Sequence, residues 1–287
     1  MSFRIAHLAL MVLSLTGSAQ AATEDWLLGL EDRSTNDFIQ DKRARPLINR
    51  VLPRELATAV IQSLGGPPDP VYVEGGRYFS ASGCMAHSCS NKGFFWMDVV
   101  AGTALGAAVD LAPAAQAGPA GDEADVLLLG SSRLDAASLP AEARRALQRF
   151  LDRNDLHPVL VTYVGKAADR QKLEPAQYTA RPRFEPPEGG PGFDCRAANA
   201  GIEKAICASP ALSKQDLELS TSYREQLKGY DRLWMVRQLQ ALQRAWVLKR
   251  NQACAPAAGQ EACLATAYRE QQDALLHWTP TFPKSAP

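Results

Sequence analysis

Residues 77–98 read RYFSASGCMAHSCSNKGFFWMD, two runs with aromatic residues on either side of a loop with two cysteines. The runs 77–80 and 93–98 favour β-strands, because aromatic side chains suit a pleated, half-buried surface. Cys84 and Cys89 are five positions apart, close enough for a disulfide at a strand end. The loop holds His87, and none of its immediate neighbours carries a charge.

Three interpretations of this loop compete. A metal site would need two thiolates, His87 and a fourth ligand, and no second histidine lies nearby. A catalytic Cys–His pair would need a free thiol, but Cys89 is placed to oxidise Cys84. The third interpretation is a disulfide-clamped loop that presents His87 outward, with a plain structural staple as its simplest form.

The sequence around the loop predicts an α+β domain on an antiparallel sheet. Strands are expected at 71–74 and 77–80, which flank Gly75-Gly76 like the arms of a hairpin, and at 93–98, 125–129 and 158–164. Helices are expected at 45–64 and 140–152 from their apolar spacing. Pro53 breaks the spacing of the first and could mark the first turn of the helix proper, and Gly65-Gly66-Pro67 stops it. Residues 101–121 are rich in Ala, Gly and Pro and predict a loose loop. The strands outnumber the helices and no βαβ spacing repeats, which favours antiparallel pairing.

A second, all-α domain is predicted after a linker. Residues 181–192 hold four prolines and three glycines and cannot form a regular element. Leucine and aromatic residues then recur at helical spacing, and about 90 residues of short helices make a thin core that disulfides would stiffen. The predicted organisation is a signal peptide (1–22), an α+β domain (23–180), the linker (181–192), a helical domain (193–277) and a tail (278–287).

Six cysteines and an export signal indicate an oxidising compartment. Arg4, the apolar run 8–15 and Ala19-Gln20-Ala21 are typical of a cleaved signal peptide, and no later apolar run is long enough to span a membrane. We therefore expect a periplasmic or secreted protein with three disulfides. Besides Cys84–Cys89, the last four cysteines allow three pairings, of which Cys195–Cys207 with Cys254–Cys263 is the most local.

Charge and histidine content exclude several functions. The formal net charge is zero, which argues against a general nucleic-acid binder. The charge divides at the linker: residues 22–190 have 22 acidic and 18 basic side chains, and residues 191–287 have 9 and 12. Only His87, His157 and His277 remain after signal cleavage, and no catalytic or phosphate-binding motif is present. The sequence predicts no enzyme and no cofactor or metal.

The stretch from Tyr78 to Gly106 resembles the inhibitor of vertebrate lysozyme (Ivy) family. In that family a Cys-x-x-His-x-Cys loop follows a strand and an aromatic-rich strand comes next; here they are Cys84-Met85-Ala86-His87-Ser88-Cys89 and Gly93–Asp98. The resemblance implies an α+β fold and a loop that enters the lysozyme cleft. The family usually has Pro before the histidine and an acidic or amide residue after it, where this chain has Ala86 and Ser88.

Residues 193–276 resemble the lysozyme-inhibitor LprI N-terminal domain family. The resemblance is carried by a cysteine, proline, aromatic and charged pattern that includes Phe193-Asp194-Cys195, Ile202–Cys207, Gln243–Trp246, Cys254 and Cys263-Leu264. Within it, Glu203, Asp216 and Arg250 are expected to be structural polar residues that form ion pairs fixing the helices, since polar groups inside small helical units need partners. Direct contact with a target is the alternative.

The sequence therefore predicts an exported lysozyme inhibitor whose disulfide-clamped loop places His87 in the active-site cleft. The expected partner is a basic, c-type lysozyme, and the basic helical domain could also suit an anionic cell-wall surface. The alternative is a non-inhibitory periplasmic binding module for cell-wall or envelope proteins. Exposure of His87 on a convex loop would favour the inhibitor, and burial would favour the alternative.

Overall fold

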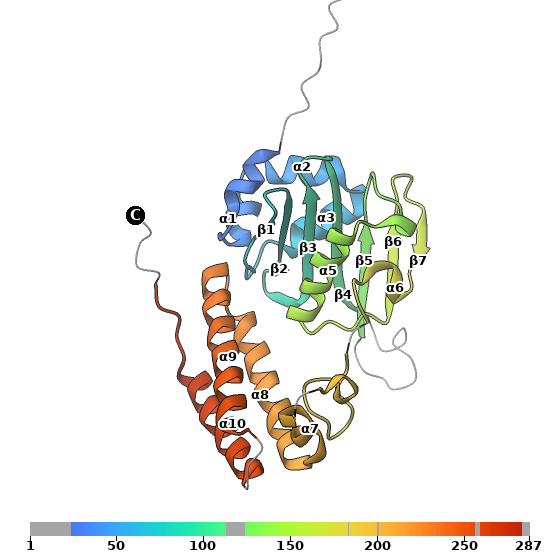
Figure 1. The fold of residues 1–287 in the computed structure, drawn as a ribbon. Helices are drawn as coiled ribbons and strands as arrows, with labels where there is room; N and C mark the ends of the chain where they lie inside the picture. Colours follow the sequence, from blue (N-terminus) through green and yellow to red (C-terminus); the bar gives the residue numbers. More distant parts are fainter. Residues whose placement is uncertain (1–23, 113–123, 183, 200, 256–258, 283–287) are drawn as a thin grey trace, which may run out of the picture.

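The computed structural model describes residues 24–112, 124–182, 184–199, 201–255 and 259–282. A region of strands and helices is followed by a region of helices alone, and the two lie one above the other in Figure 1. The predicted signal peptide, the end of the predicted loop at 113–121 and the end of the tail fall outside the described residues. The described residues of the predicted linker contain no helix or strand.

The first region is built on a mixed sheet of seven strands in the order β1-β2-β3-β4-β5-β6-β7. The strands are β1 Tyr72–Glu74, β2 Tyr78–Met85, β3 Ser88–Asp98, β4 Thr103–Ala112, β5 Ala124–Gly130, β6 Leu160–Val164 and β7 Arg170–Lys172. Neighbouring strands are antiparallel except β5 and β6, which run parallel because α5 (Ala141–Arg153) crosses between them. The predicted α+β class is confirmed, with this one parallel pair added.

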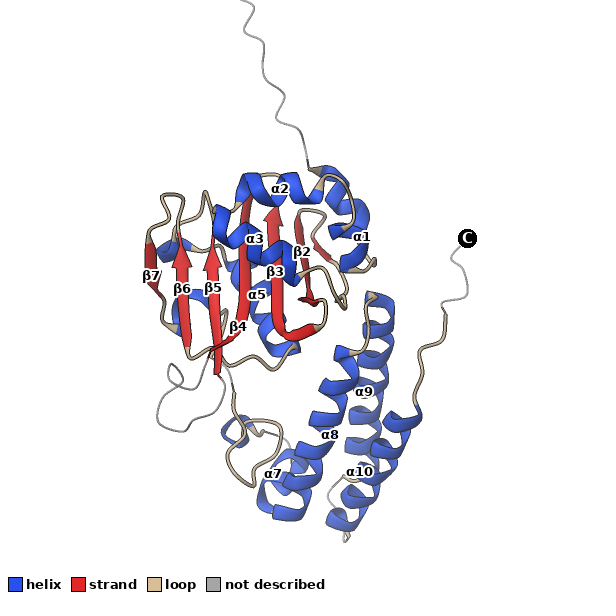
Figure 2. Ribbon diagram, turned by 180° about the vertical axis from the view of Figure 1, so that it is seen from behind, coloured by secondary structure: helices blue, strands red, loops and turns tan. Residues whose placement is uncertain are grey.

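Helices cover both faces of the sheet. The remaining elements of this region are η1 Asp25–Leu30, α1 Thr35–Ile39, α2 Ala44–Val51, α3 Arg54–Ser63, η2 Ala136–Ser138 and α6 Pro175–Tyr178. Figure 2 shows α2 and α3 on the near face and α5 behind the sheet. Side chains of β3 alternate between the two cores: Phe95 and Met97 pack with α2 and α3, whereas Phe94 and Trp96 pack with α5. The apolar run 93–98 is therefore buried on both sides.

The predicted helix 45–64 is two helices. α2 ends at Val51 and α3 begins at Arg54. Pro53 has no N–H to donate and forces the residue before it out of the helical region, so Leu52 is extended, with φ −114° and ψ 154°. The apolar periodicity continues through the break because both helices pack on the same face of the sheet.

The predicted loose loop 101–121 is wrong for its first half. Residues 103–112 form β4, a central strand paired with β3 and β5. Its small residues are a consequence of close packing, since a Cβ added at Gly106 would lie 2.4 Å from a methyl carbon of Leu52. Ala and Gly therefore indicate here a strand pressed against a helix, where propensity alone indicates a loop.

The second region contains α7 Gly201–Ala208, α8 Pro210–Lys228, α9 Leu233–Ala253 and α10 Gln260–His277, preceded by the short η3 Cys195–Ala197. Ser209 caps α8 by accepting from the Leu212 N–H, and Gly229 ends it. One small core joins the helices, with Leu239, Leu264 and Tyr268 at its centre. Disulfides Cys195–Cys207 and Cys254–Cys263 are present, so the local pairing predicted for these cysteines is confirmed.

Polar contacts join the two regions. Arg232 pairs with Asp37 at 3.1 Å, and the Trp234 N–H donates to Asp32 at 2.8 Å. Arg153 of α5 donates to the Tyr230 carbonyl at 2.6 Å. The start of α9 is thus fixed to the first region by side chains of α1, α5 and the loop before α1. Within the described ranges, no helix is both long and apolar enough to cross a membrane.

Candidate functional site

The candidate site is the tip of the hairpin formed by β2 and β3. The strands pair in register from Tyr78↔Asp98 to Cys84↔Lys92, and the register then shifts to Met85↔Ser88. The shift leaves Ala86 and His87 as the two turn residues. A disulfide joins Cys84 to Cys89, with their Cα atoms 4.8 Å apart. Neither sulfur is therefore free to bind a metal or act as a nucleophile.

His87 is exposed at the outermost position of this turn. Its φ is +63°, in the left-handed region where histidine is one of the few enriched side chains other than glycine. Ala86, Cys89 and Ser90 are also exposed. Among the described residues, the His87 imidazole makes no hydrogen bond and no ion pair. Both ring nitrogens remain available to a partner.

Just below its tip, the hairpin is held on one side by the segment that follows α3. Gly66 N–H donates to the Cys84 carbonyl at 2.8 Å, and Cys84 N–H donates to the Pro67 carbonyl at 3.2 Å. A Cβ at Gly66 would lie 2.6 Å from the Ala86 nitrogen, so only glycine allows this approach. In the sequence, Gly65-Gly66-Pro67 predicts the end of a helix. No local pattern indicates that Gly66 and Pro67 also support the hairpin.

The tip carries little charge of its own. Residues 78–91 contain no Asp, Glu, Lys or Arg, so the imidazole of His87 is the one basic side chain in this stretch. Lys92, which lies opposite Cys84 in the hairpin, is half-buried, and burial lowers its pKa. The imidazole of His87 therefore stands on an otherwise uncharged tip.

The other histidines have partners. His157 lies 3.2 Å from Glu185 and 3.5 Å from Asp155, and His277 lies 3.5 Å from Asp273 on its own helix. No cluster of three or more His, Cys, Asp or Glu side chains among the described residues could hold a metal ion. His87 differs from both in standing on a disulfide-closed turn.

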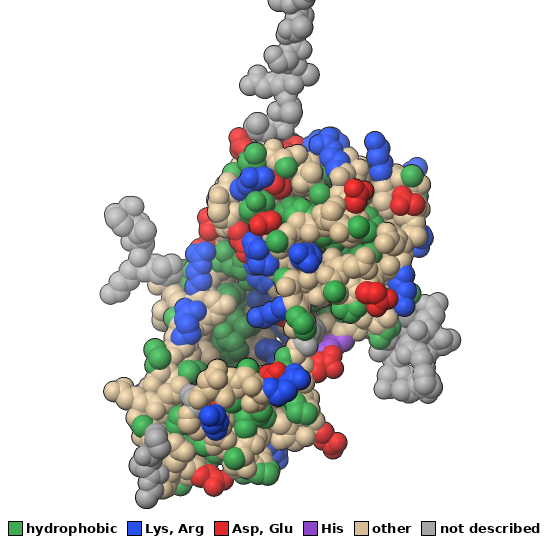
Figure 3. All heavy atoms as spheres, turned by 45° about the vertical axis from the view of Figure 1, so that its right-hand side comes forward, with side chains coloured by type: hydrophobic (Ala, Val, Ile, Leu, Met, Phe, Trp, Pro, Cys, Tyr) green, Lys and Arg blue, Asp and Glu red, His purple; other side chains and the backbone are tan. Residues whose placement is uncertain are grey.

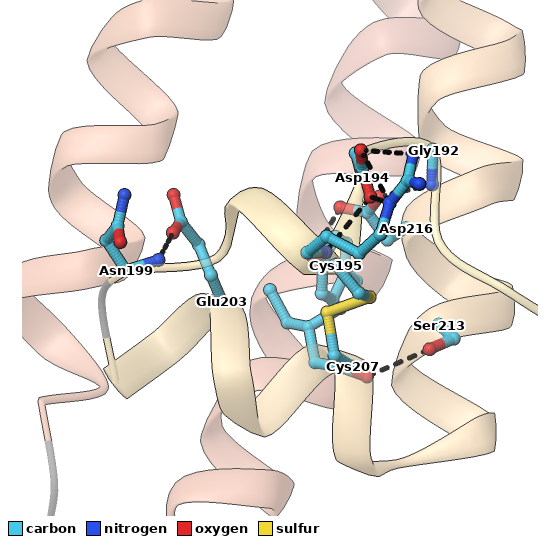
Figure 4. The surroundings of a disulfide bond; sticks show 11 residues. Gly192, Asp194, Cys195, Asn199, Glu203, Cys207, Ser213 and Asp216 are labelled. Carbon is cyan, nitrogen blue, oxygen red and sulfur yellow. Dashed lines mark hydrogen bonds and ion pairs between the residues drawn. A yellow bond between two sulfur atoms is a disulfide. The ribbon is translucent and has the colours of Figure 1, made fainter. Parts of the chain in front are cut away.

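Two of the three polar residues predicted in the helical region, Asp216 and Arg250, meet at one tyrosine. The Tyr268 hydroxyl donates to Asp216 at 2.7 Å and accepts from Arg250 at 3.0 Å. All three residues are buried, and burial followed by the charge of Asp216 raises the pKa of Tyr268. Asp216 also accepts from the Gly192 N–H at 2.9 Å, which holds the end of the predicted linker against α8 (Figure 4).

Glu203 lies apart from this trio. It accepts from the Asn199 N–H at 2.9 Å, across the turn that leads into α7 (Figure 4). Glu203, Asp216 and Arg250 nevertheless line one cavity of about 380 Å³. The three charged residues are predicted as structural polar groups, whereas Tyr268 is given no polar role. A buried tyrosine hydroxyl needs a partner, and this could have indicated the contact.

Two family matches agree with these two regions. Residues 46–153 match the family described as inhibitor of vertebrate lysozyme (Ivy), and residues 195–276 match the family described as lysozyme inhibitor LprI. No match was found among curated proteins or among solved structures. Both resemblances read from the sequence are thus confirmed.

The matches carry general functional information. Both families are described as lysozyme inhibitors, which favours an inhibitor over an enzyme, and the three disulfides fit an oxidising compartment. The chain therefore joins an Ivy-like sheet region to an LprI-like helical region, and both indicate inhibition of lysozyme as its general function.

Proposed function

We propose that this protein inhibits lysozyme by inserting the turn Ala86-His87 into the active-site cleft, where the His87 imidazole binds the catalytic carboxyl groups. The observation that carries the proposal is the exposed imidazole, without a partner among the described residues, on a two-residue hairpin turn. The Cys84–Cys89 disulfide and the contacts of Gly66 and Pro67 support the turn from below.

The chemistry of lysozyme suits this side chain. Its active site has two carboxyl groups flanking the scissile bond, one protonated and one ionised. An imidazole has a nitrogen on each side of the ring and can hydrogen-bond both carboxyl groups, most strongly as the imidazolium. A turn that is already closed loses little conformational entropy on docking, so more of the contact energy contributes to affinity.

Charge supports the choice of partner. The sheet region, taken with the predicted linker, has a net charge of −4 over residues 22–190. A basic, c-type lysozyme has the complementary sign, which speeds the encounter and adds specificity. Export by the predicted signal peptide would bring the inhibitor to the compartment where lysozyme attacks the cell wall.

The direct test is a muramidase assay with the purified chain and its His87→Ala variant. Loss of a hydrogen bond to a charged group is worth about 1.5–3 kcal/mol, so the inhibition constant should rise about 10- to 100-fold. His277→Ala is the matched control, because that histidine is exposed at the end of α10 and pairs only within its own helix among the described residues. It should inhibit like the unchanged chain.

Two results would contradict the proposal. If the unchanged chain leaves several lysozyme types active, inhibition fails and the alternative of a binding module for cell-wall or envelope proteins gains support. If His87→Ala and His277→Ala both inhibit fully, the chain inhibits by another surface, and the role of His87 is wrong.

A further inference from the structure

A cleft of about 640 Å³ lies where the sheet region meets the helical region. One wall comes from α5 and the other from α8 and α9, which contribute the apolar side chains Leu227 and Val236. Residues 84–89, all of them described, do not line it. The cleft is therefore a different site from the hairpin tip.

The lining of the cleft is rich in arginine. Five arginines line it, three from α5, one from α8 and one from the predicted linker, against one carboxylate, Asp152. Figure 3 shows Lys and Arg side chains gathered where the surface is hollowed between the two regions. A low-dielectric hollow lined by one sign of charge concentrates ions of the opposite sign.

The inner arginines are held in place by the protein. Arg149 pairs with Glu74 at 2.5 Å and lies over the Tyr72 ring at 4.3 Å. Arg153 pairs with Asp69 at 2.8 Å and also donates to a carbonyl of the helical region. These ion pairs fix the two guanidinium groups in the inner part of the cleft and neutralise their charge.

The outer arginines have weaker contacts. Arg145 lies 3.3 Å from Glu142 one turn away, and Arg181 lies 3.6 Å from Asp152. Arg224 donates to the Thr221 hydroxyl at 3.3 Å. Exposed pairs of this kind are worth little, so these guanidinium groups can turn to an incoming oxyanion and bind it through two nitrogens.

Gln148 supplies a second, independent observation. Its side chain is buried, with 5% exposed, and it lines the cleft. Its amide nitrogen donates to Asp152 at 2.8 Å, while its Oε1 has no hydrogen-bond partner among the described residues. A buried acceptor without a donor is costly. The oxygen is closed to solvent in this conformation, so a ligand N–H in the cleft would satisfy it once the amide group turns toward the cleft.

We propose that this cleft binds a small acidic molecule that also carries an amide. Its carboxylate or phosphate group contacts Arg145, Arg181 and Arg224, its amide N–H donates to Gln148 Oε1, and its apolar part lies against Leu227 and Val236. This site gives the chain a small-molecule ligand in addition to its protein target.

The test is calorimetric titration of the full mature chain at low salt with three probes. N-acetylmuramyl-L-alanyl-D-isoglutamine has a carboxylate and amides, N-acetylglucosamine has the amide without the acid, and inorganic phosphate has the oxyanion without the amide. We expect the first probe to bind at least tenfold more tightly than either of the others. Equal affinity for phosphate or for the neutral sugar would overturn the proposal.

Matched variants locate the binding. The double variant Arg145→Ala/Arg224→Ala should weaken binding of the acidic probe about tenfold or more. The control Arg54→Ala/Arg269→Ala removes the same charge from exposed positions elsewhere and should leave it unchanged. Equal weakening by both would overturn the assignment to the cleft. If the first double variant fails to fold, Arg181→Ala, at a side chain 76% exposed, replaces it.

Discussion

The two regions use their disulfides for different purposes. In the sheet region, cores on both faces of the sheet hold the fold, and Cys84–Cys89 lies beyond them at an exposed tip. In the helical region, two disulfides and the buried trio of Asp216, Tyr268 and Arg250 surround a single small core. A disulfide next to a large core is free to shape a surface, whereas one next to a small core is needed for stability.

The largest loss of stability is expected for Arg250→Ala in the helical region. Arg250 is 7% exposed, and its loss leaves Asp216 and Tyr268 buried without the cation beside them. Removing one partner of a buried charged network costs about 3–5 kcal/mol of unfolding free energy. Urea unfolding followed by circular dichroism measures it, with Arg269→Ala as the exposed control. A loss below about 1 kcal/mol would show that the trio contributes little.

Removing a disulfide from each region sharpens the comparison. Cys195→Ala/Cys207→Ala should cost about 3 kcal/mol of unfolding free energy, from the chain entropy of a 12-residue separation, and leave inhibition of lysozyme unchanged. Cys84→Ala/Cys89→Ala should cost about 2 kcal/mol by the same relation but abolish most inhibition. Thermal unfolding and a muramidase assay on both variants separate the two effects. Equal loss of inhibition in both would undo the contrast.

Alkaline pH should weaken the helical region through Tyr268. Burial and then Asp216 raise the pKa of this hydroxyl above the value of about 10 that tyrosine has in an unfolded chain. Above pH 10 the unfolded chain releases a proton that the folded chain keeps, so stability falls as pH rises, by about 1.4 kcal/mol per pH unit. Tyr268→Phe should remove this contribution. Unfolding curves between pH 9.5 and 11.5 give both slopes, and identical slopes would refute the assignment.

His87→Gly should have the smallest effect on stability. It should also separate the role of the turn backbone from the role of the imidazole. Glycine adopts a φ of +63° without the steric cost of a side chain, so the variant should gain about 0.5 kcal/mol. It should also lose inhibition to the same degree as His87→Ala. Melting temperatures and inhibition constants of the two variants check this. A glycine variant that inhibits fully would show that the turn backbone, and not the imidazole, makes the contact.

Local patterns predicted the parts of the fold in which sequence neighbours interact. The hairpin at Gly75-Gly76 follows from two adjacent glycines, both with positive φ, and α5 follows from its apolar stripe and the proline before it. The four helical-region cysteines paired locally, as expected for short loops. The position of Cys84–Cys89 at a strand end came from the same kind of information.

The parts that could not be predicted depend on distant neighbours. β4 looked like a loop because its small residues are explained only by Leu52 pressing on Gly106. The support of the hairpin by Gly66 joins segments that belong to different elements. The basic cleft requires α5 to face α8 and α9, and that placement rests on contacts such as Trp234 to Asp32, which are 202 positions apart. No local pattern in the sequence encodes such a contact.

The polar contacts between the two regions bear on how each half of the chain can change during evolution. Arg232–Asp37, Arg237–Glu31 and the Trp234–Asp32 hydrogen bond lie at or near the surface, and each region keeps its own apolar core. Separating the regions would return these exposed groups to water, where they are well solvated. Because neither apolar core contains residues of the other region, a substitution inside one core changes the packing of its own region alone.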